Sequence, residues 1–238
     1  MLHKIRLIAF DLDDTLWPCM PVIEAAEQQL YDWLGQYYPR ITDNHSPESM
    51  VEERKTFTQR DPLFGIDLSL MRREFLRYIA DRHGYHGPTV SAEGFEVFFN
   101  ARQQVTFYDD VDDALDWLAE RYQLGAISNG NASVQHVGLG EFFKHSPSAS
   151  DVQTAKPDPK IFSHFVQQSG YQADEILYVG DHPLNDVVAP LAAGYQAVWL
   201  NREGSEWPQQ FDPPEHEIQD LSQLVGLLDG VIKGQEPL

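Results

Sequence analysis

Four short apolar runs, each ending at a polar residue or a glycine, predict the buried strands of a sheet. The runs cover residues 5–10, 124–127, 175–179 and 196–200, and they stop at Asp11, Ser128, Gly180 and Asn201. Helical periodicity precedes the last three runs, beginning at Asp110 as a helix cap, at Asp158 and near Asn185. Because strands alternate with helices, we expect an α/β fold with a doubly wound, mostly parallel sheet.

The interval between residues 17 and 104 has a different pattern. Apolar residues recur there at helical spacing, first at Ile23, Ala26, Leu30 and Trp33 and again at Leu68, Met71, Phe75 and Ile79. Since the interval shows no convincing strand, it predicts a smaller helical domain over 17–104, inserted into a core domain made of 1–16 and 105–238. Near the end of the chain, 207–217 is expected to be a surface loop and 221–232 an amphipathic helix.

The charge, the apolar runs and the single cysteine limit the partners and the cellular location that we expect for this protein. The 238 residues include 37 Asp and Glu against 17 Lys and Arg, and the formal net charge of -20 disfavours a nucleic acid partner. No apolar run approaches the roughly 18 to 20 residues of a membrane helix, and the first residues lack the pattern of a signal peptide. The lone cysteine, Cys19, has no partner for an internal disulfide. We therefore expect a cytoplasmic protein with no membrane partner, and the sequence leaves its oligomeric state open.

Two carboxylates follow the first predicted strand, in the segment Phe10-Asp11-Leu12-Asp13-Asp14-Thr15. Asp11 and Asp13 are two positions apart, so both side chains point to the same side of an extended chain. Open α/β sheets bind their ligands at this carboxyl edge. The pair therefore predicts a functional site, although taken alone it also fits an acidic exit from a strand into a loop.

Three further segments add polar side chains near the same edge. Ser128-Asn129-Gly130 follows the second predicted strand, and Gly180-Asp181, with Asp186 five residues later, follows the third. Lys156 precedes Pro157, which keeps it out of helical geometry. Each segment alone is typical of a turn, a solvated charge or a helix start, but together they gather acids, a cation and hydrogen-bonding groups on one rim. His83 and His86, by contrast, lie in a predicted surface turn and are not interpreted as a metal pair.

These segments resemble the haloacid dehalogenase (HAD) superfamily of phosphohydrolases. The matching segments are Asp11-Leu12-Asp13-Asp14-Thr15, Ser128-Asn129, Lys156 and Gly180-Asp181-His182-Pro183-Leu184-Asn185-Asp186, in the family's order. The predicted helical insertion lies where members of this superfamily with a cap between the first and second motifs carry that cap. The resemblance thus implies a HAD-like Rossmannoid core with a helical cap domain.

The resemblance also implies an activity, that of a Mg²⁺-dependent phosphatase acting on a small-molecule phosphate monoester. Asp11 would be the nucleophile that forms an aspartyl-phosphate, Asp13 the general acid and base, and Thr15 the residue that orients Asp13. Ser128 and Asn129 would bind the phosphoryl group, and Lys156 would pair with the phosphate and with Asp11. The metal ligands would be Asp11, the carbonyl oxygen of Asp13, and Asp181, while Asp186 would act in the outer shell of the metal or hold Lys156.

Elementary chemistry agrees with these roles. A carboxylate can approach an anionic ester only when cations neutralise the charge, and Mg²⁺ prefers oxygen ligands of this kind. Asp13 favours a phosphatase over a hydrolytic dehalogenase, because a halide leaves without a proton. A phosphoryl mutase and a non-catalytic regulatory HAD-like module remain alternatives, whereas a phospho-accepting receiver domain is about half this length and lacks the insertion.

Overall fold

The structure, a computed structural model, describes residues 2–234, which divide into two compact units. The core unit consists of the residues up to Pro18, Thr106–Gly130 and the residues from Val134 onward. The helical unit consists of Cys19–Val105 together with the short segment Asn131–Ser133. The chain therefore leaves the core unit after the first strand and returns to it, and each unit is described separately below.

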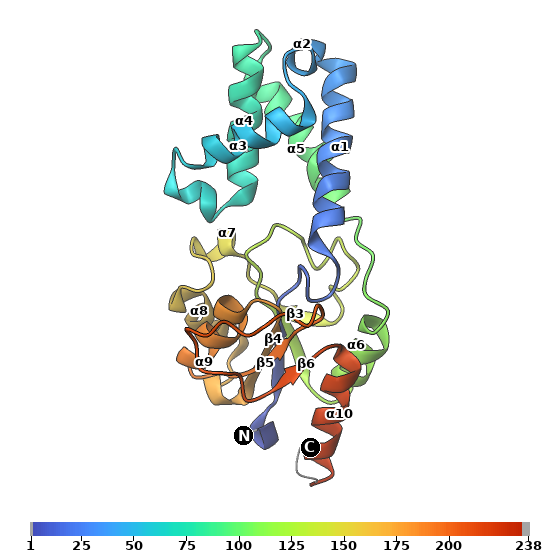
Figure 1. The fold of residues 1–238 in the computed structure, drawn as a ribbon, viewed down its shortest axis with the longest axis vertical. Coiled ribbons are helices and arrows are strands. Elements are labelled where there is room, and N and C mark those ends of the chain that lie inside the picture. Colours follow the sequence, from blue (N-terminus) through green and yellow to red (C-terminus); the bar gives the residue numbers. More distant parts are fainter. Residues whose placement is uncertain (1, 235–238) are drawn as a thin grey trace. The chain divides into compact units, whose positions relative to one another are not determined.

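The core unit is built on a six-stranded sheet in the order β3-β2-β1-β4-β5-β6, in which every neighbouring pair is parallel (Figure 1). The strands are β1 (Leu7–Phe10), β2 (Gln123–Ala126), β3 (Phe143–His145), β4 (Ile176–Gly180), β5 (Gln196–Leu200) and β6 (Glu217–Ile218). This sheet confirms the predicted α/β class and its four main strands. The edge strands β3 and β6 were not expected, because two or three residues that pair on one side show no periodicity.

Helices cover both faces of the sheet. In Figure 1, α8 (Pro159–Ser169) and α9 (Ala189–Ala192) lie on one side, and α6 (Val111–Ala119) and α10 (Leu221–Ile232) lie on the other. Leu7 and Ala9 of β1 pack with Phe162 and Phe165 of α8, as the alternation of side chains along a strand requires. Shorter elements are α7 (Ala149–Val152), the 3₁₀-helices Leu2–Lys4 and Ala173–Glu175, and the π-helix η4 (Pro183–Val188).

Two expectations for the core unit need correction. The helix expected from about Asn185 to Ala193 is divided into η4 and α9, and the π-helical turn begins at Pro183, two residues after Asp181. Asp110 precedes α6 but its carboxylate does not cap that helix. Instead, Oδ2 of Asp110 accepts the N–H of Leu221 (2.6 Å), so it satisfies a free donor at the start of α10.

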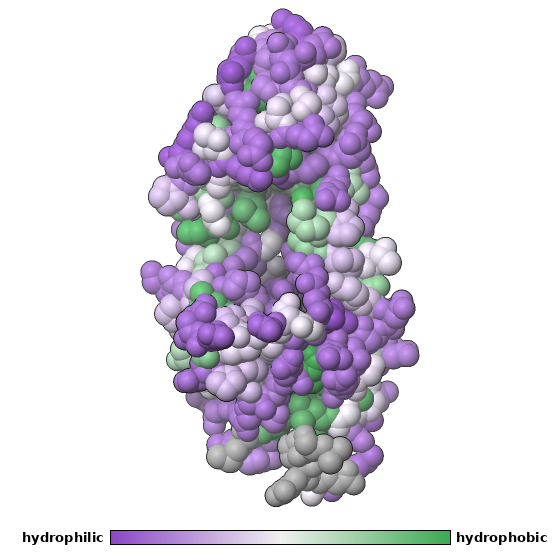
Figure 2. Space-filling model, in the orientation of Figure 1, coloured by the Kyte–Doolittle hydropathy of each residue, from purple (hydrophilic) through white to green (hydrophobic). Residues whose placement is uncertain are grey.

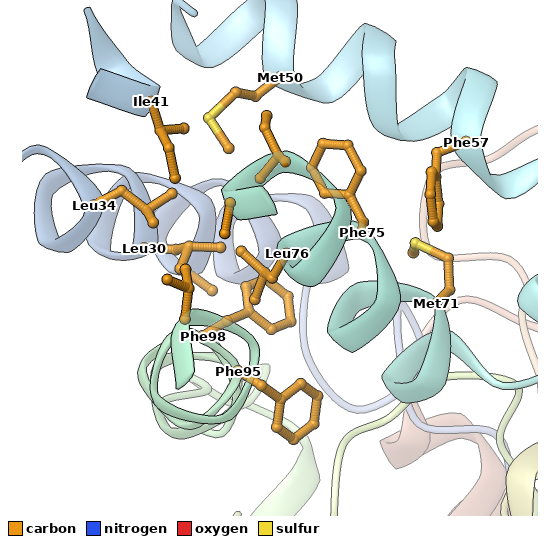
Figure 3. Close-up of a cluster of buried hydrophobic side chains, with 14 of the residues drawn as sticks. Leu30, Leu34, Ile41, Met50, Phe57, Met71, Phe75, Leu76, Phe95 and Phe98 are labelled. Atoms are coloured by element: carbon orange, nitrogen blue, oxygen red, sulfur yellow. The ribbon is translucent and has the colours of Figure 1, made fainter. Parts of the chain in front are cut away.

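The helical unit contains five α-helices around one apolar cluster. They are α1 (Cys19–Tyr37), α2 (Pro39–Thr42), α3 (Pro47–Thr58), α4 (Leu68–Arg82) and α5 (Gly87–Arg102), with a 3₁₀-helix at Pro62–Gly65. Figure 3 shows side chains such as Leu30, Phe75 and Phe98 pointing toward one another from these helices. Ser46 caps α3 and Asp67 caps α4 through side-chain hydrogen bonds.

A buried ion pair is embedded in the helical unit. The guanidinium of Arg72 donates to both carboxylate oxygens of Glu27 (2.7 and 3.2 Å), and Arg54 pairs with the same carboxylate. Arg72 also lies over the ring of Phe98, 3.3 Å from its centroid. Burial alone would raise the pKa of Glu27, but Arg72 and Arg54 outweigh it and lower that pKa.

The surface agrees with the acidic composition. On the face shown in Figure 2, hydrophilic residues predominate and hydrophobic residues form scattered patches. In the described part of the chain, every helix is too short or too polar to cross a membrane.

Candidate active site

The first site element is the loop that follows β1. Asp11 is buried, and its N–H donates to the carbonyl of Val179 (2.9 Å), which extends the pairing of β1 with β4 by one residue. The chain then turns tightly, with the N–H of Leu16 bonded to the carbonyl of Leu12 (2.8 Å) and Asp14 at φ 58°. Asp14 tolerates this left-handed conformation because short polar side chains stabilise it locally.

Hydrogen bonds from an indole N–H and a hydroxyl group hold two of the carboxylates near this loop. The indole N–H of the buried Trp17 donates to Oδ1 of Asp13 (2.9 Å), four residues earlier. The hydroxyl of Thr15 donates to Oδ1 of Asp181 (3.3 Å), at the end of β4. The proposed role of Thr15 in orienting Asp13 stays a prediction, while its contact with Asp181 joins the first and last motif segments.

Ser128 and Asn129 lie just beyond β2. Oγ of Ser128 accepts the N–H of Gly130 (3.0 Å), which orders the turn. The side chain of Asn129 accepts the N–H of Lys156 (2.8 Å) and donates to its carbonyl (2.9 Å). Asn129 thus holds the backbone of the lysine, a contact that comes in addition to the phosphate binding expected of it.

Lys156 is the centre of the site. Its buried ammonium donates to Oδ1 of Asp11 (2.7 Å), Oδ1 of Asp186 (2.7 Å) and the hydroxyl of Tyr178 (2.8 Å). Burial lowers the pKa of Lys156, but Asp11 and Asp186 outweigh this effect and raise it well above its ordinary value. The lysine therefore carries a fixed positive charge beside Asp11.

Three carboxylates gather at this point. Asp11, Asp181 and Asp186 each offer an oxygen, and the three oxygens lie within 4.8 Å of one another. Gly180 permits the close approach, because a Cβ at that position would lie 2.6 Å from Cγ of Asp186. Oδ2 of Asp186 accepts the N–H of His182 (2.9 Å), and Trp199 donates to the carbonyl of Asp181 (2.7 Å).

The cluster has more negative charge than one lysine neutralises. Burial raises the pKa of Asp11 well above its ordinary value, against the opposing effect of Lys156. Burial, followed by Asp186 and Asp14, raises the pKa of Asp181 to about 7. A hard divalent cation would remove this conflict, because it prefers carboxylate oxygens and adds two positive charges. The donor set therefore fits Mg²⁺.

The structure brings together most of the residues that the motifs indicated. Asp11, Lys156, Asp181 and Asp186 form one cluster, Thr15 contacts it through Asp181, and Asn129 contacts it through Lys156. Trp17, Tyr178 and Trp199 were missed by the sequence analysis. Each of them looks like an ordinary core aromatic residue in the sequence, because only its polar atom takes part in the site.

Comparison with known proteins identifies the family. A family model of haloacid dehalogenase-like hydrolases matches residues 5–194, and the chain belongs to this family.

Its relatives include both phosphatases and dehalogenases. The chain is 28% identical to 5-amino-6-(5-phospho-D-ribitylamino)uracil phosphatase of Escherichia coli K12, with 95% of this chain and 98% of the relative covered. It is 26% identical to an (S)-2-haloacid dehalogenase of Pseudomonas putida, again over 95% and 98%. A crystal structure of a 2-haloacid dehalogenase from Pseudomonas syringae pv. Tomato DC3000 matches with a TM-score of 0.88 and 36% identity, covering 94% of this chain and 98% of that one.

Proposed function

We propose that this hydrolase is a Mg²⁺-dependent phosphatase that cleaves a small-molecule phosphate monoester through an aspartyl-phosphate on Asp11. The observation that carries the proposal is the cluster of Asp11, Asp181 and Asp186 beside a single lysine. Such a site repels a phosphate dianion unless a divalent cation is bound. Asp11 and Asp181 would hold Mg²⁺ through carboxylate oxygens and Asp13 through its carbonyl oxygen, and the ion would supply positive charge to the phosphoryl group.

The nucleophile is prepared by its neighbours. Lys156 keeps Asp11 oriented through the contact of 2.7 Å and favours its ionised form. A carboxylate oxygen of Asp11 attacks phosphorus, so a new O–P bond forms while the bond to the ester oxygen breaks. Ser128 and Asn129 would donate hydrogen bonds to the phosphoryl oxygens during this transfer.

Asp13 would handle the proton in both halves of the reaction. It gives a proton to the departing ester oxygen, and it then takes one from the water that attacks the aspartyl-phosphate. The water releases phosphate and restores the Asp11 carboxylate. Trp17 supports this role, because its hydrogen bond orients the carboxylate of Asp13.

A hydrolytic 2-haloacid dehalogenase is the second candidate. The structural match to the Pseudomonas syringae dehalogenase, with 36% identity, favours it. Its chemistry would also begin with Asp11, which would attack a carbon atom and expel a halide. A halide needs neither a proton from Asp13 nor a metal ion, so the two candidates differ in what they require.

Two parallel assays test the proposal. We expect release of inorganic phosphate from p-nitrophenyl phosphate with Mg²⁺, no release after EDTA treatment, and poor activity with Ca²⁺, whose longer bonds and higher coordination number would displace Asp11. D181A should lose this activity, and D11N is the inactive control. Halide release from 2-chloropropionate that persists in EDTA, without phosphate release from any ester, would instead establish the dehalogenase.

The substrate requires a wider screen. A panel of small phosphate esters should include the substrates named for the relatives, 5-amino-6-(5-phospho-D-ribitylamino)uracil and glyceraldehyde 3-phosphate. A phosphatase releases inorganic phosphate from its preferred ester, whereas a mutase converts it into an isomeric ester. A chain that turns over no ester of the panel and releases no halide from 2-chloropropionate would be the regulatory module.

A further inference from the structure

The hydroxyl of Tyr178 lies at the back of the catalytic cluster. Tyr178 is in β4, and none of its surface is exposed. Its oxygen accepts a hydrogen bond from Nζ of Lys156 (2.8 Å) and donates one to the carbonyl of Ile127 (2.8 Å), directly before Ser128. One phenol oxygen therefore joins the catalytic lysine to the chain that carries the second motif.

Counting hydrogens fixes the direction of these bonds. An ammonium group has three N–H donors and no acceptor. Asp11, Asp186 and Tyr178 take all three of those of Lys156, at 2.7, 2.7 and 2.8 Å. The tyrosine oxygen must accept, so its own hydrogen goes to Ile127. Burial raises the pKa of Tyr178 well above its ordinary value, which keeps the phenol protonated for this task.

We propose that Tyr178 is a positioning residue for the reaction, which sets the ammonium of Lys156 against Asp11 and couples it to the Ile127 carbonyl. The inference rests on the proposed function, because it takes Lys156 as a participant in phosphoryl transfer. Without the phenol oxygen, the third N–H of Lys156 would face an aromatic ring. A buried charged donor without a partner is costly, so the ammonium would turn or shift away from Asp11.

A second buried tyrosine offers a matched control. Tyr195 is 2% exposed and donates a hydrogen bond of 2.8 Å to a main-chain carbonyl, that of Phe162. Both tyrosines pack edge-on against the ring of Phe162, at 5.9 Å and 80° for Tyr178 and at 5.7 Å and 78° for Tyr195. Both variants, Y178F and Y195F, thus remove one buried hydroxyl from the same apolar cluster, but only Y178F removes a partner of Lys156.

The experiment compares steady-state kinetics of the full-length variants with p-nitrophenyl phosphate and Mg²⁺. Y178F should lower kcat by about 10-fold to 100-fold, the effect of losing a hydrogen bond to a charged group, with KM changed by less than about threefold. Y195F should keep the wild-type kcat. Thermal unfolding of both variants shows whether they lose similar stability. A kcat of Y178F that equals that of Y195F overturns the inference, because the hydroxyl would then be purely structural.

A spectroscopic readout separates this inference from the proposed function. The NMR signal of the Lys156 ammonium, assigned by its loss in K156M, should move or broaden in Y178F and stay in place in Y195F. If no phosphate ester is hydrolysed by the wild type, the proposed function fails, and an altered Lys156 signal still supports the positioning. An unchanged Lys156 signal in Y178F overturns the positioning role of Tyr178.

If Y178F does not fold, difluorotyrosine can replace Tyr178. It keeps the shape of the side chain, but its oxygen accepts a hydrogen bond more weakly, so kcat should fall by less than the roughly 10-fold to 100-fold expected of Y178F. An unchanged kcat contradicts the inference.

Discussion

Asp11 and Asp13 are two residues apart in the sequence but have different surroundings. Asp11 is 8% exposed and ion-paired with Lys156, whereas Asp13 is held by the indole of Trp17 on a loop. The first environment suits a nucleophile that is fixed in position. The second suits a group that exchanges protons with the leaving oxygen and with water. The two residues should therefore fail differently when they are substituted.

The first prediction follows from this difference. D11N should abolish turnover and the formation of any acyl phosphate, because it removes the nucleophile. D13N should slow turnover by roughly 10² to 10⁴, the usual contribution of a general acid and base. With p-nitrophenyl phosphate, whose leaving group needs little protonation, D13N should accumulate phosphate on the peptide that contains Asp11, as seen by mass spectrometry of quenched enzyme. An adduct on Ser128 would contradict the mechanism.

Most of the motif residues could be predicted because they follow apolar runs, and parallel strands bring their carboxyl ends to one edge. Their partners could not be predicted. Trp17, Tyr178 and Trp199 each use one polar atom in a contact that spans from 4 to 22 residues. The sequence does not distinguish such residues from other aromatic residues of the core, because only the folded chain shows where the N–H or O–H group points.

At the scale of elements, Arg202 joins three parts of the core unit. It follows β5, and its guanidinium donates twice to the carbonyl of Thr15 (3.1 and 3.0 Å) and to both oxygens of Asp110 (3.0 Å each). Asp110 also accepts the N–H of Leu221. The loop after β1, the start of α6 and the start of α10 are thereby connected through one planar, bidentate group.

The second prediction concerns this connection. The side chains of Arg202 and Asp110 are 13% and 14% exposed, so R202M would leave a largely buried carboxylate without its counter-ion. R202M should lower the free energy of unfolding by about 3 kcal/mol, measured by urea denaturation. The double variant R202M/D110N should lose less than the sum of the single variants, because no unpaired charge is left. Additive losses would show that the pair does not act as a unit.

In the helical unit, two histidines meet where α2 and α3 approach the end of α4. Nε2 of His45 and Nε2 of His83 are 3.0 Å apart, so one ring must donate while the other accepts. Glu53 lies 3.5 Å from Nδ1 of His45, and Arg82 and Arg40 are the nearby cations. Burial, followed by His45 and Arg82, lowers the pKa of His83 below its ordinary value of 6.5.

The third prediction is a loss of stability in acid. The unfolded chain binds a proton at His83 near pH 6.5, and the folded chain binds it only at lower pH. The stabilising contribution is therefore complete above that value and is lost as the pH falls below it. The melting temperature of the helical unit should decrease from pH 7 to pH 5 less steeply in H83Q, which keeps a donor but does not titrate. H86Q, on the exposed turn, is the control and should match the wild type.

The elements themselves were predictable to different degrees. Long amphipathic helices such as α1 and α4 repeat their apolar pattern over several turns, so the pattern alone locates them. The edge strand β6 has two residues and pairs with β5 only after the chain has folded. The π-helical turn at Pro183–Val188 has the composition of an ordinary helix start. The π-helical geometry places the carboxylate of Asp186 against Lys156. The contact with Lys156, rather than the local helix propensity, therefore accounts for this geometry.

At the scale of the whole molecule, the chain has a core unit that contains all of the candidate catalytic residues and a helical unit with its own apolar core. The core unit continues on both sides of the insertion, and its two ends there are close together. The N–H of Tyr108 donates to the carbonyl of Leu16 (3.0 Å), and the rings of Trp17 and Phe107 are 5.9 Å apart. A short linker can therefore replace the helical unit without stretching the core.

The fourth prediction tests whether the core unit carries catalysis and the helical unit carries substrate specificity. A variant in which a short Gly-Ser linker replaces Cys19–Val105 should fold, because the sheet and its covering helices lie within the core unit. It should still hydrolyse p-nitrophenyl phosphate slowly, since every proposed catalytic side chain is retained, and the same deletion with D11N is the inactive control. We expect it to lose discrimination among metabolite phosphates, measured as the spread of kcat/KM over the ester panel, because the helical unit would supply the contacts to the leaving group and exclude water. A folded deletion variant that discriminates as well as the full chain would place specificity in the core unit and contradict this division.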